Sequence, residues 1–303
     1  MGLLTIQALN GLQYGVLLFL LAAGLTLVFG IMNFVNLAHG SFYMLGAYLG
    51  AAIYSASGSF VLAAIAAVTG ALAIGITIER TTLIAFYGRD HLYQVLATVG
   101  LILFFNEIAR IIWGSSAIYM RAPQHFTGAI DLFGILYPSY RFLVIVVGLA
   151  VAVTLYILIH HTRIGMLTRA GATNLRMVSV LGVNIRLLNT ILFGLGAALA
   201  GLAGVMAAPI LAVQPGMGDQ IIITVLVVIV VGGIGSIRGA FFGALIIGLV
   251  DTIGRIYLPI LLSHLMARDI ADAAGSALAS MLIYLFMAAV LAVKPQGLFP
   301  VVR

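Results

Sequence analysis

The sequence predicts an all-α membrane protein, a polytopic helical bundle of about eight to ten transmembrane segments. Hydrophobic residues make up 63% of the 303 residues, charged residues only 7%, and the mean hydropathy is +1.23. The apolar residues fall in blocks of roughly 20, the length of helix that crosses about 30 Å of hydrocarbon. They lack the alternation of a lipid-facing barrel strand. We therefore expect a single transmembrane domain over residues 1–303.

The residue inventory argues against several classes of chemistry. Cysteine is absent, which removes disulfides and thiolate metal sites, and the six histidines show no metal-ligand spacing. We predict no catalytic residue and no metal ligand. The only lysine is Lys294 and no GxxxxGK[ST] loop occurs, so a partner subunit would have to bind ATP. Positive charge in a membrane protein marks the cytoplasmic side first, so the net charge of +6 does not indicate nucleic-acid binding.

Nine apolar spans are long enough, or nearly long enough, to cross the membrane as helices. No Asp, Glu, Lys or Arg precedes Glu79, so the first three spans carry no charge. In chain order the spans lie at roughly 9–29, 36–54, 60–78, 92–112, 141–159, 187–211, 220–233, 240–262 and 274–293.

The second and seventh spans are expected to be broken or re-entrant helices. The second contains His39-Gly40-Ser41, and the seventh is short and ends in Gly232-Gly233-Ile234-Gly235-Ser236. Irregular backbone at membrane depth is tolerated only where it is buried in protein or lines a polar cavity. We interpret Gly232, Gly233 and Gly235 as a hinge between two membrane segments, because no βαβ unit surrounds them and the spacing is not that of a dinucleotide-binding loop.

The sixth and eighth spans contain closely spaced glycines that predict tight helix packing. Small residues allow helix backbones to approach one another where no hydrophobic force drives helices together. The glycines concerned are Gly194/Gly196, Gly201/Gly204 and Gly239/Gly243/Gly248.

Polar residues within spans are the candidates for a translocation path, because they are costly there and usually face a cavity. Asn33, Asn36 and His39 recur every three residues and would share a face if this stretch is helical. The sequence does not decide whether these three residues line a substrate path or cap the ends of broken helices. The further path candidates are Ser41, Glu107 and Gln214.

Two acid–base pairs fall within the fourth and eighth spans. Glu107 precedes Arg110 by three residues and Asp251 precedes Arg255 by four, spacings that allow pairing within one helix. The sequence favours self-neutralising pairs near the membrane edge over a functional site.

The loop of residues 160–186 sets the orientation. It contains no acidic residue and carries Arg163, Arg169, Arg176 and Arg186, so the positive-inside rule makes it cytoplasmic. With nine spans the N-terminus lies outside and the C-terminus inside.

A short amphipathic helix is expected within this cytoplasmic loop. Thr173 or Asn174 can cap its start, and Gly182 with Asn184 can stop it after Leu181. The apolar stripe of this helix would be Leu175, Val178 and Leu181, beside Arg169 and Arg176. Such a helix can lie on membrane lipid or insert into a groove of a soluble partner, and composition does not choose between them.

Several short motifs follow one another along nearly the whole chain. They are Asn33-Phe34-Val35-Asn36-Leu37-Ala38-His39-Gly40, Met44-Leu45-Gly46-Ala47-Tyr48, Thr162-Arg163-Ile164-Gly165, Leu181-Gly182-Val183-Asn184, Gly232-Gly233-Ile234-Gly235-Ser236 and Lys294-Pro295-Gln296-Gly297-Leu298-Phe299. Together they resemble the bacterial inner-membrane permeases of branched-chain amino acid ABC transporters, of the LivH type.

The resemblance implies an importer that works by alternating access. Its parts would be two related permease subunits, expected as a heterodimer, two cytoplasmic ATPases that bind ATP and Mg, and a periplasmic solute-binding protein. Segment 162–187 would be the segment that couples the permease to the ATPase. The resemblance therefore favours insertion of its amphipathic helix into a groove of the ATPase over binding to membrane lipid. Movement of the coupling segment, driven by ATP binding to the ATPases, would open and close a path beside Asn33, Asn36 and His39.

Two departures from the family pattern bear on substrate and partner. Many family members carry an acidic residue where this chain has Ser41, and acidic residues in the coupling helix where it has Thr173 and Asn174. Family members also transport urea, amides and carboxylic acids. The alternative function is a stand-alone channel or secondary carrier for such a small solute, which would transport without nucleotide.

Overall fold

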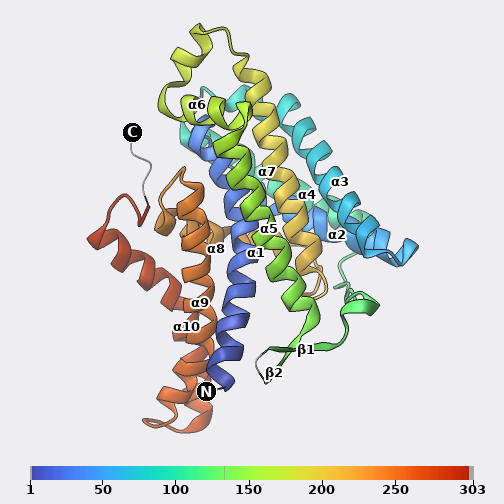
Figure 1. Cartoon of the computed structure of the whole chain (residues 1–303), viewed down its shortest axis with the longest axis vertical. Helices are drawn as coiled ribbons and strands as arrows, with labels where there is room; N and C mark the ends of the chain where they lie inside the picture. Colours follow the sequence, from blue (N-terminus) through green and yellow to red (C-terminus); the bar gives the residue numbers. More distant parts are fainter. Residues whose placement is uncertain (1, 133, 300–303) are drawn as a thin grey trace.

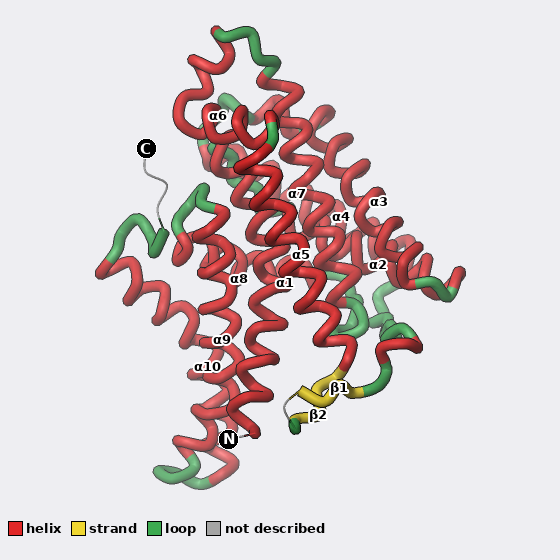
Figure 2. The backbone as a smooth tube through the Cα atoms, viewed as in Figure 1, coloured by secondary structure: helices red, strands yellow, loops and turns green. Residues whose placement is uncertain are grey.

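The computed structural model describes residues 2–132 and 134–299, which form one helical bundle (Figures 1 and 2). The long helices are α1 (Gly2–Met32), α2 (His39–Ser57), α3 (Phe60–Thr81), α4 (His91–Trp113), α5 (Ser139–His161), α6 (Arg163–Val180), α7 (Ile185–Ala207), α8 (Met217–Gly232), α9 (Ile237–Leu262) and α10 (Arg268–Val293). Short elements are the 3-10 turns η1 (Leu83–Phe86) and η2 (Gln124–Phe126) and the strands β1 (Ala129–Leu132) and β2 (Ile135–Pro138).

All nine predicted spans are helices, and seven of them are long and apolar enough to cross a membrane. The two that fall outside this group are α2 and α8, the helices expected to be broken or re-entrant. With 16 residues, α8 is about 24 Å long, which is shorter than the hydrocarbon core. The class of the fold is therefore confirmed as a polytopic helical membrane protein.

The chain turns back into the protein after α1. The His39 side chain lies against Gly24, two turns before the end of α1 at Met32. Residues 33–38 are not helical, and Asn33 itself adopts a positive φ of 47°. The condition for a shared face of Asn33, Asn36 and His39 is therefore not met, because residues 33–38 are not helical.

Helices α1 and α7 form the centre of the bundle, and most of each is buried, unlike the other five helices that are long and apolar enough to cross a membrane. A helix that is apolar on all sides can be covered by lipid or by other helices, and other helices cover most of α1 and α7. The small residues of α7 allow neighbouring helices to pack closely against it. Gly196, the midpoint of α7, approaches Gly24 of α1 so closely that a Cβ added to Gly196 would lie 2.9 Å from the Gly24 carbonyl oxygen.

The remaining predicted glycine contacts are also confirmed. Gly201 of α7 meets Gly46 of α2, Gly248 of α9 meets Gly15 of α1, and Gly243 of α9 meets Gly232 of α8. Without side chains at these crossings, helix backbones come into direct contact.

A small hairpin on the side opposite α6 was not predicted. Strands β1 and β2 pair antiparallel, with Ile130 opposite Tyr137 (Figure 2). The Tyr137 side chain is fully buried, and its hydroxyl donates to Asn10 of α1 at 3.3 Å. Burial raises the pKa of Tyr137 to about 12, so the phenol keeps its proton and remains a donor at neutral pH.

Candidate functional site

The two short helices begin against each other inside the bundle. Gly40 in the first turn of α2 touches the backbone of Gly218 in the first turn of α8. The first turn of a helix has N–H groups with no partner inside the helix, and the helix dipole makes this end positive. The contact therefore brings two positive helix ends together.

Unpaired buried polar atoms surround the start of α2. They are the side-chain amide of Asn36, Nε2 of His39 and the hydroxyl of Ser41, with Thr26 of α1 and Asn189 of α7 also unpaired among the described residues. More than 90% of buried polar groups in proteins have a hydrogen-bond partner, so such a set indicates a place for water or solute. Three predicted path candidates, Asn36, His39 and Ser41, thus lie together, and their role in a path stays a prediction.

A polar cavity of about 490 Å³ adjoins this point, between α1, α2, α8 and α9. Tyr43, one turn along α2 from Gly40, and Met217, the first residue of α8, both line it. Its full lining is Tyr14, Tyr43, Leu211, Ala212, Gln214, Met217, Gln220, Ile221, Thr224, Asp251, Thr252 and Arg255. Gln214 is the only predicted path candidate in this lining.

The ionic pair in this cavity was not selected as part of a functional site from the sequence. Arg255 Nε donates to Asp251 Oδ2 at 2.9 Å, so the predicted pairing within α9 is present. The carboxylate is buried and the guanidinium is more than half exposed. An ionisable residue within a membrane span was the available signal, but the i,i+4 spacing favoured a merely self-neutralising pair.

Two predicted path candidates lie elsewhere. Asn33 is exposed at the end of α1. Glu107 is exposed on α4 and pairs with Arg110 at 2.6 Å, so it lies on the surface of that helix and does not line the polar cavity.

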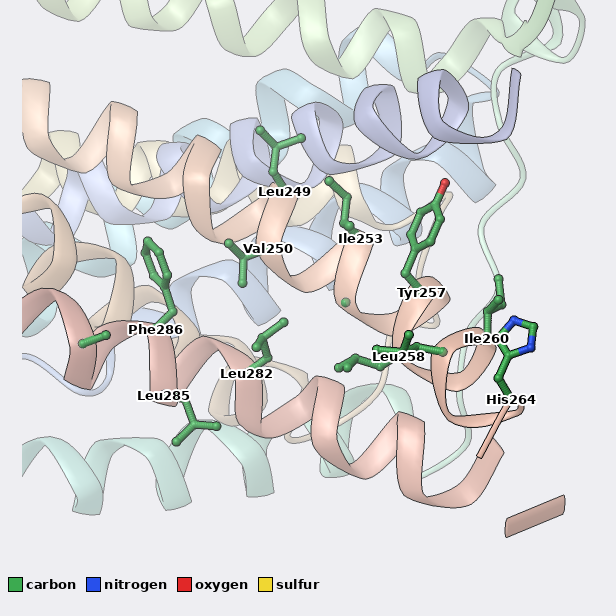
Figure 3. A pocket seen from close by; sticks show the side chains of 13 residues that line it. Leu249, Val250, Ile253, Tyr257, Leu258, Ile260, His264, Leu282, Leu285 and Phe286 are labelled. Atoms are coloured by element: carbon green, nitrogen blue, oxygen red, sulfur yellow. The ribbon is translucent and has the colours of Figure 1, made fainter. Parts of the chain in front are cut away.

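A second groove is apolar and lies between α9 and α10 (Figure 3). Its volume is about 770 Å³, and the side chains projecting into view are mainly aliphatic, such as Ile253 of α9 and Leu282 of α10. Tyr257 and His264 are its polar members. With so few polar groups it suits lipid or an apolar partner surface better than a polar solute.

The predicted hinge is a turn between α8 and α9. Gly233 and Gly235 have φ values of 108° and 82°, which side chains other than glycine rarely adopt. The C-terminal segment pairs with this turn, because the Leu298 N–H donates to Val231 and the Phe299 N–H donates to the Gly232 carbonyl. Hinge motion at this turn stays a prediction.

The predicted cytoplasmic helix is the second half of α6. Asn174 is not helical (φ −153°, ψ 91°), so it kinks α6, and its Oδ1 accepts from the Met177 N–H at 3.0 Å as a helix cap. Gly182, with φ 86°, ends the helix. These predictions are confirmed, but Asn184 caps the start of α7 through the Leu187 N–H instead of helping to stop α6.

The apolar stripe of this helix differs from the predicted one. Val178 is buried and Leu175 is half-buried, whereas Leu181 is 76% exposed. The kink at Asn174 turns Val178 inward and leaves Met177, Val180 and Leu181 as the exposed apolar group, which we call the α6 tip. Arg163 and Arg176 are exposed, and Arg169 is exposed while one of its guanidinium nitrogens donates to the Ile159 carbonyl at the end of α5.

A buried carboxylate joins three segments next to α6. Glu79 of α3 is fully buried and accepts from the Tyr87 hydroxyl at 2.6 Å and from the Thr190 hydroxyl of α7 at 2.8 Å. Burial, and then the hydrogen bond and charge of Glu79, raise the pKa of Tyr87 above its ordinary value. The sequence marked Glu79 only as the first charge in the chain.

Gln94 extends this network to the segment before α2. Its amide nitrogen donates to the Arg89 carbonyl, and its oxygen accepts from the Val35 N–H at 3.2 Å. Phe34 packs edge-on against Tyr87, with ring centroids 5.5 Å apart. The start of α7, directly after α6, is thereby connected to the segment that leads to Asn36 and His39.

Near the other end of α4, Asn106 is expected to contribute to stability. Its amide donates to Asp219 Oδ2 at 2.8 Å and its oxygen accepts from the Gly216 N–H, which holds the turn before α8. Asn106→Ala leaves both partners unpaired, and we expect a loss of about 1–3 kcal/mol in the free energy of unfolding. Thermal unfolding in detergent checks this.

Glu107→Gln is the matched control for Asn106→Ala, since it removes an exposed ion pair from the neighbouring position. Exposed pairs contribute about 0–1 kcal/mol, so the control should unfold close to wild type. Equal stability of Asn106→Ala and the control would show that Asn106 does not hold this turn.

Comparison with known proteins gives consistent matches over most of the chain. Residues 7–291 match the family described as branched-chain amino acid transport system / permease component. The high-affinity branched-chain amino acid transport system permease protein LivH of Salmonella typhimurium is 31% identical over 265 residues, 83% of this chain and 86% of that protein. BraD of Pseudomonas aeruginosa, described in the same words, is 32% identical over 82% of this chain and 85% of its own length. The ribose import permease protein RbsC of Escherichia coli is 28% identical, covering 77% of this chain and 72% of that protein.

Proposed function

Because this chain belongs to the permease family of branched-chain amino acid transport systems, we propose that it is one transmembrane subunit of an ATP-driven importer for branched-chain amino acids. Its location would be the bacterial inner membrane. Its partners would be a second, related permease subunit, two cytoplasmic ATPases that bind ATP and Mg, and a periplasmic solute-binding protein. This chain would bind no cofactor itself.

The α6 tip is the observation that supports the ATPase partner most directly. Met177, Val180 and Leu181 are large apolar residues exposed on a helix that contacts α1, α5 and α7, on the side that the arginines of this segment would place in the cytoplasm. Contiguous exposed apolar residues rimmed by charge mark an interaction site, and Arg176 supplies such a charge. Motion of the tip would reach α7 directly, because only residues 181–184 separate α6 from α7.

The substrate path is proposed to include the polar cavity and the unpaired polar atoms at the start of α2. The two helix starts at Gly40 and Gly218 lie in the bundle interior, as in transporters that bind solute at the ends of discontinuous helices. Small sliding of α2 against α8 would open or close the connection between the cavity and Asn36, His39 and Ser41. Within the described residues, no feature favours a channel or secondary carrier that works without a partner.

Leu181→Asp is expected to lower recovery of the ATPase subunit by about tenfold or more when the tagged chain is purified from its native membranes. A charge placed in the apolar centre of an interface must be desolvated without a partner, which costs several kcal/mol. The readout is the amount of ATPase and second permease that co-purifies in mild detergent. The membrane core should remain folded, because Leu181 is exposed.

Leu136→Asp is the control for this experiment. Leu136 is similarly exposed, at 73%, but lies in β2 on the opposite side of the protein (Figure 1). Unchanged ATPase recovery with Leu181→Asp would contradict the coupling role of the α6 tip. Purification of the wild-type chain alone, with solute transport in liposomes that lack ATP, would support the carrier alternative instead.

A further inference from the structure

The polar cavity contains two opposite charges with unused hydrogen-bonding capacity. Arginine has five N–H donors, and Arg255 uses only Nε, toward Asp251. Among the described residues, neither terminal nitrogen of Arg255 has a hydrogen bond, and Asp251 Oδ1 accepts none. Both groups line the same 490 Å³ space.

Neutral polar groups stand opposite this pair. Tyr14 of α1 and Thr224 of α8 each add a hydroxyl group to the lining. Gln220 of α8 adds a side-chain amide to the lining. Hydrogen-bond donors and acceptors therefore face the charged pair across the cavity.

The rest of the lining combines the polar residues Gln214 and Thr252 with apolar residues. Ala212, Met217 and Ile221 lie on the segment before α8 and on its first turns. Met217 is also the residue next to the crossing of Gly40 and Gly218. The cavity is thus charged along α9 and carries apolar residues among the polar ones where α8 begins.

We propose that this cavity binds a zwitterionic α-amino acid with an apolar side chain. The substrate carboxylate would accept from the two free terminal nitrogens of Arg255, and its ammonium group would donate to Oδ1 of Asp251. The side chain would lie against Met217 and Ile221. This assignment rests on the proposed function and gives it a substrate-binding site within this chain.

The charges are what distinguish this site from one for a neutral solute such as a sugar. Hydrogen bonds in which one partner is ionised are roughly twice as strong as neutral ones, and a carboxylate matches the planar guanidinium fork. A zwitterion gives each member of the Asp251–Arg255 pair an opposite charge without adding net charge to the cavity. A sugar offers neither charge and would use only the neutral groups.

Equilibrium binding of radiolabelled leucine to the full chain in lipid nanodiscs tests the proposal. Competitors are leucinamide, which lacks the carboxylate, and 4-methylpentanoate, which lacks the ammonium group. We expect unlabelled leucine to compete and each half-analogue to compete at least about tenfold more weakly, since each loses a hydrogen bond to a charged group. Absence of saturable leucine binding, or competition by either half-analogue as strong as that by leucine, would overturn the proposal.

The double variant Asp251→Asn/Arg255→Gln removes both charges together. It avoids the unpaired buried charge that a single substitution would leave, so the chain should still fold, which its melting temperature checks. We expect leucine binding to weaken by at least about tenfold. Wild-type affinity in the folded double variant would overturn the proposal.

Arg255→Lys tests whether leucine binding needs only a positive charge or also the geometry of the guanidinium group. Lysine keeps the positive charge beside Asp251 but lacks the two parallel donors, so leucine binding should weaken while leucinamide competition stays as in wild type. Equal leucine affinity of Arg255→Lys and wild type would show that the carboxylate does not meet the guanidinium fork.

Uptake by cells that express the whole transporter tests the proposed function separately. Equal uptake of branched-chain amino acids by wild-type cells and by cells with the folded double variant is one possible result. In that case the proposed binding site is wrong, and the proposed importer function is supported. If the transporter takes up none of these amino acids, the proposed function fails, whatever the nanodisc experiment shows.

Discussion

Gly40→Val should destabilise the protein by about 3 kcal/mol or more, at the upper end of what overpacking costs in a protein interior. A Cβ at this position would overlap the Gly218 carbonyl group, and backbone atoms cannot move aside as the end of a flexible side chain can. The two helix starts would have to separate, and with them the wall of the polar cavity at Met217. Thermal unfolding in detergent measures the loss.

Gly100→Val is the matched control on the surface of α4. It makes the same chemical change at an exposed helical glycine whose added Cβ would meet no atom within 4 Å. Its melting temperature should be that of wild type or slightly higher, because glycine is unfavourable within a helix. If Gly40→Val melts at the same temperature as this control, the crossing of α2 and α8 is not the tight contact described above.

Glu79→Ala should destabilise the protein by about 1–3 kcal/mol, the cost of leaving a buried hydroxyl without its partner. The orphaned group would be the Tyr87 hydroxyl, because Thr190 keeps a second acceptor in the Arg186 carbonyl at 3.0 Å. We expect the start of α7 to lose its link to the segment before α2. Unfolding in detergent reports the stability, and ATP-driven uptake reports the coupling.

A second substitution separates the hydrogen bond from packing. In Glu79→Ala/Tyr87→Phe both partners are apolar, so part of the lost stability should return, and the double-mutant cycle should show a positive coupling energy. Strict additivity of the two substitutions would rule out an energetic role for this hydrogen bond. Tyr87→Phe alone should cost less than Glu79→Ala, because Glu79 then keeps Thr190 as its donor.

Much of the architecture follows from properties that are local in sequence. Blocks of apolar residues specify membrane helices, because a helix satisfies its own backbone in lipid and needs only an apolar surface about 20 residues long. The turns are local as well. Asn174 caps a helix three residues on, and Gly182 ends it by a left-handed conformation that glycine adopts readily. The interruption before α2 was also visible in the sequence.

The candidate site depended on contacts between distant parts of the chain. The ionic pair of Asp251 and Arg255 was visible from its spacing, but not that a cavity opens beside it between four helices. Gln214 was selected as a path candidate, and only packing placed it in that cavity. Glu107 was also selected, but packing placed it on the outer surface of α4.

The sequence alone therefore determined the class of the protein, the order of its apolar helices and the glycine-rich turn between α8 and α9. Hydropathy and backbone preference act over a few residues, so they can be assessed without knowing the fold. The tertiary structure alone decided that Gly40 meets Gly218 and that Glu79 meets Thr190, residues 111 positions apart. Such contacts depend on how whole helices cross, and the same apolar faces and small residues are compatible with many crossings.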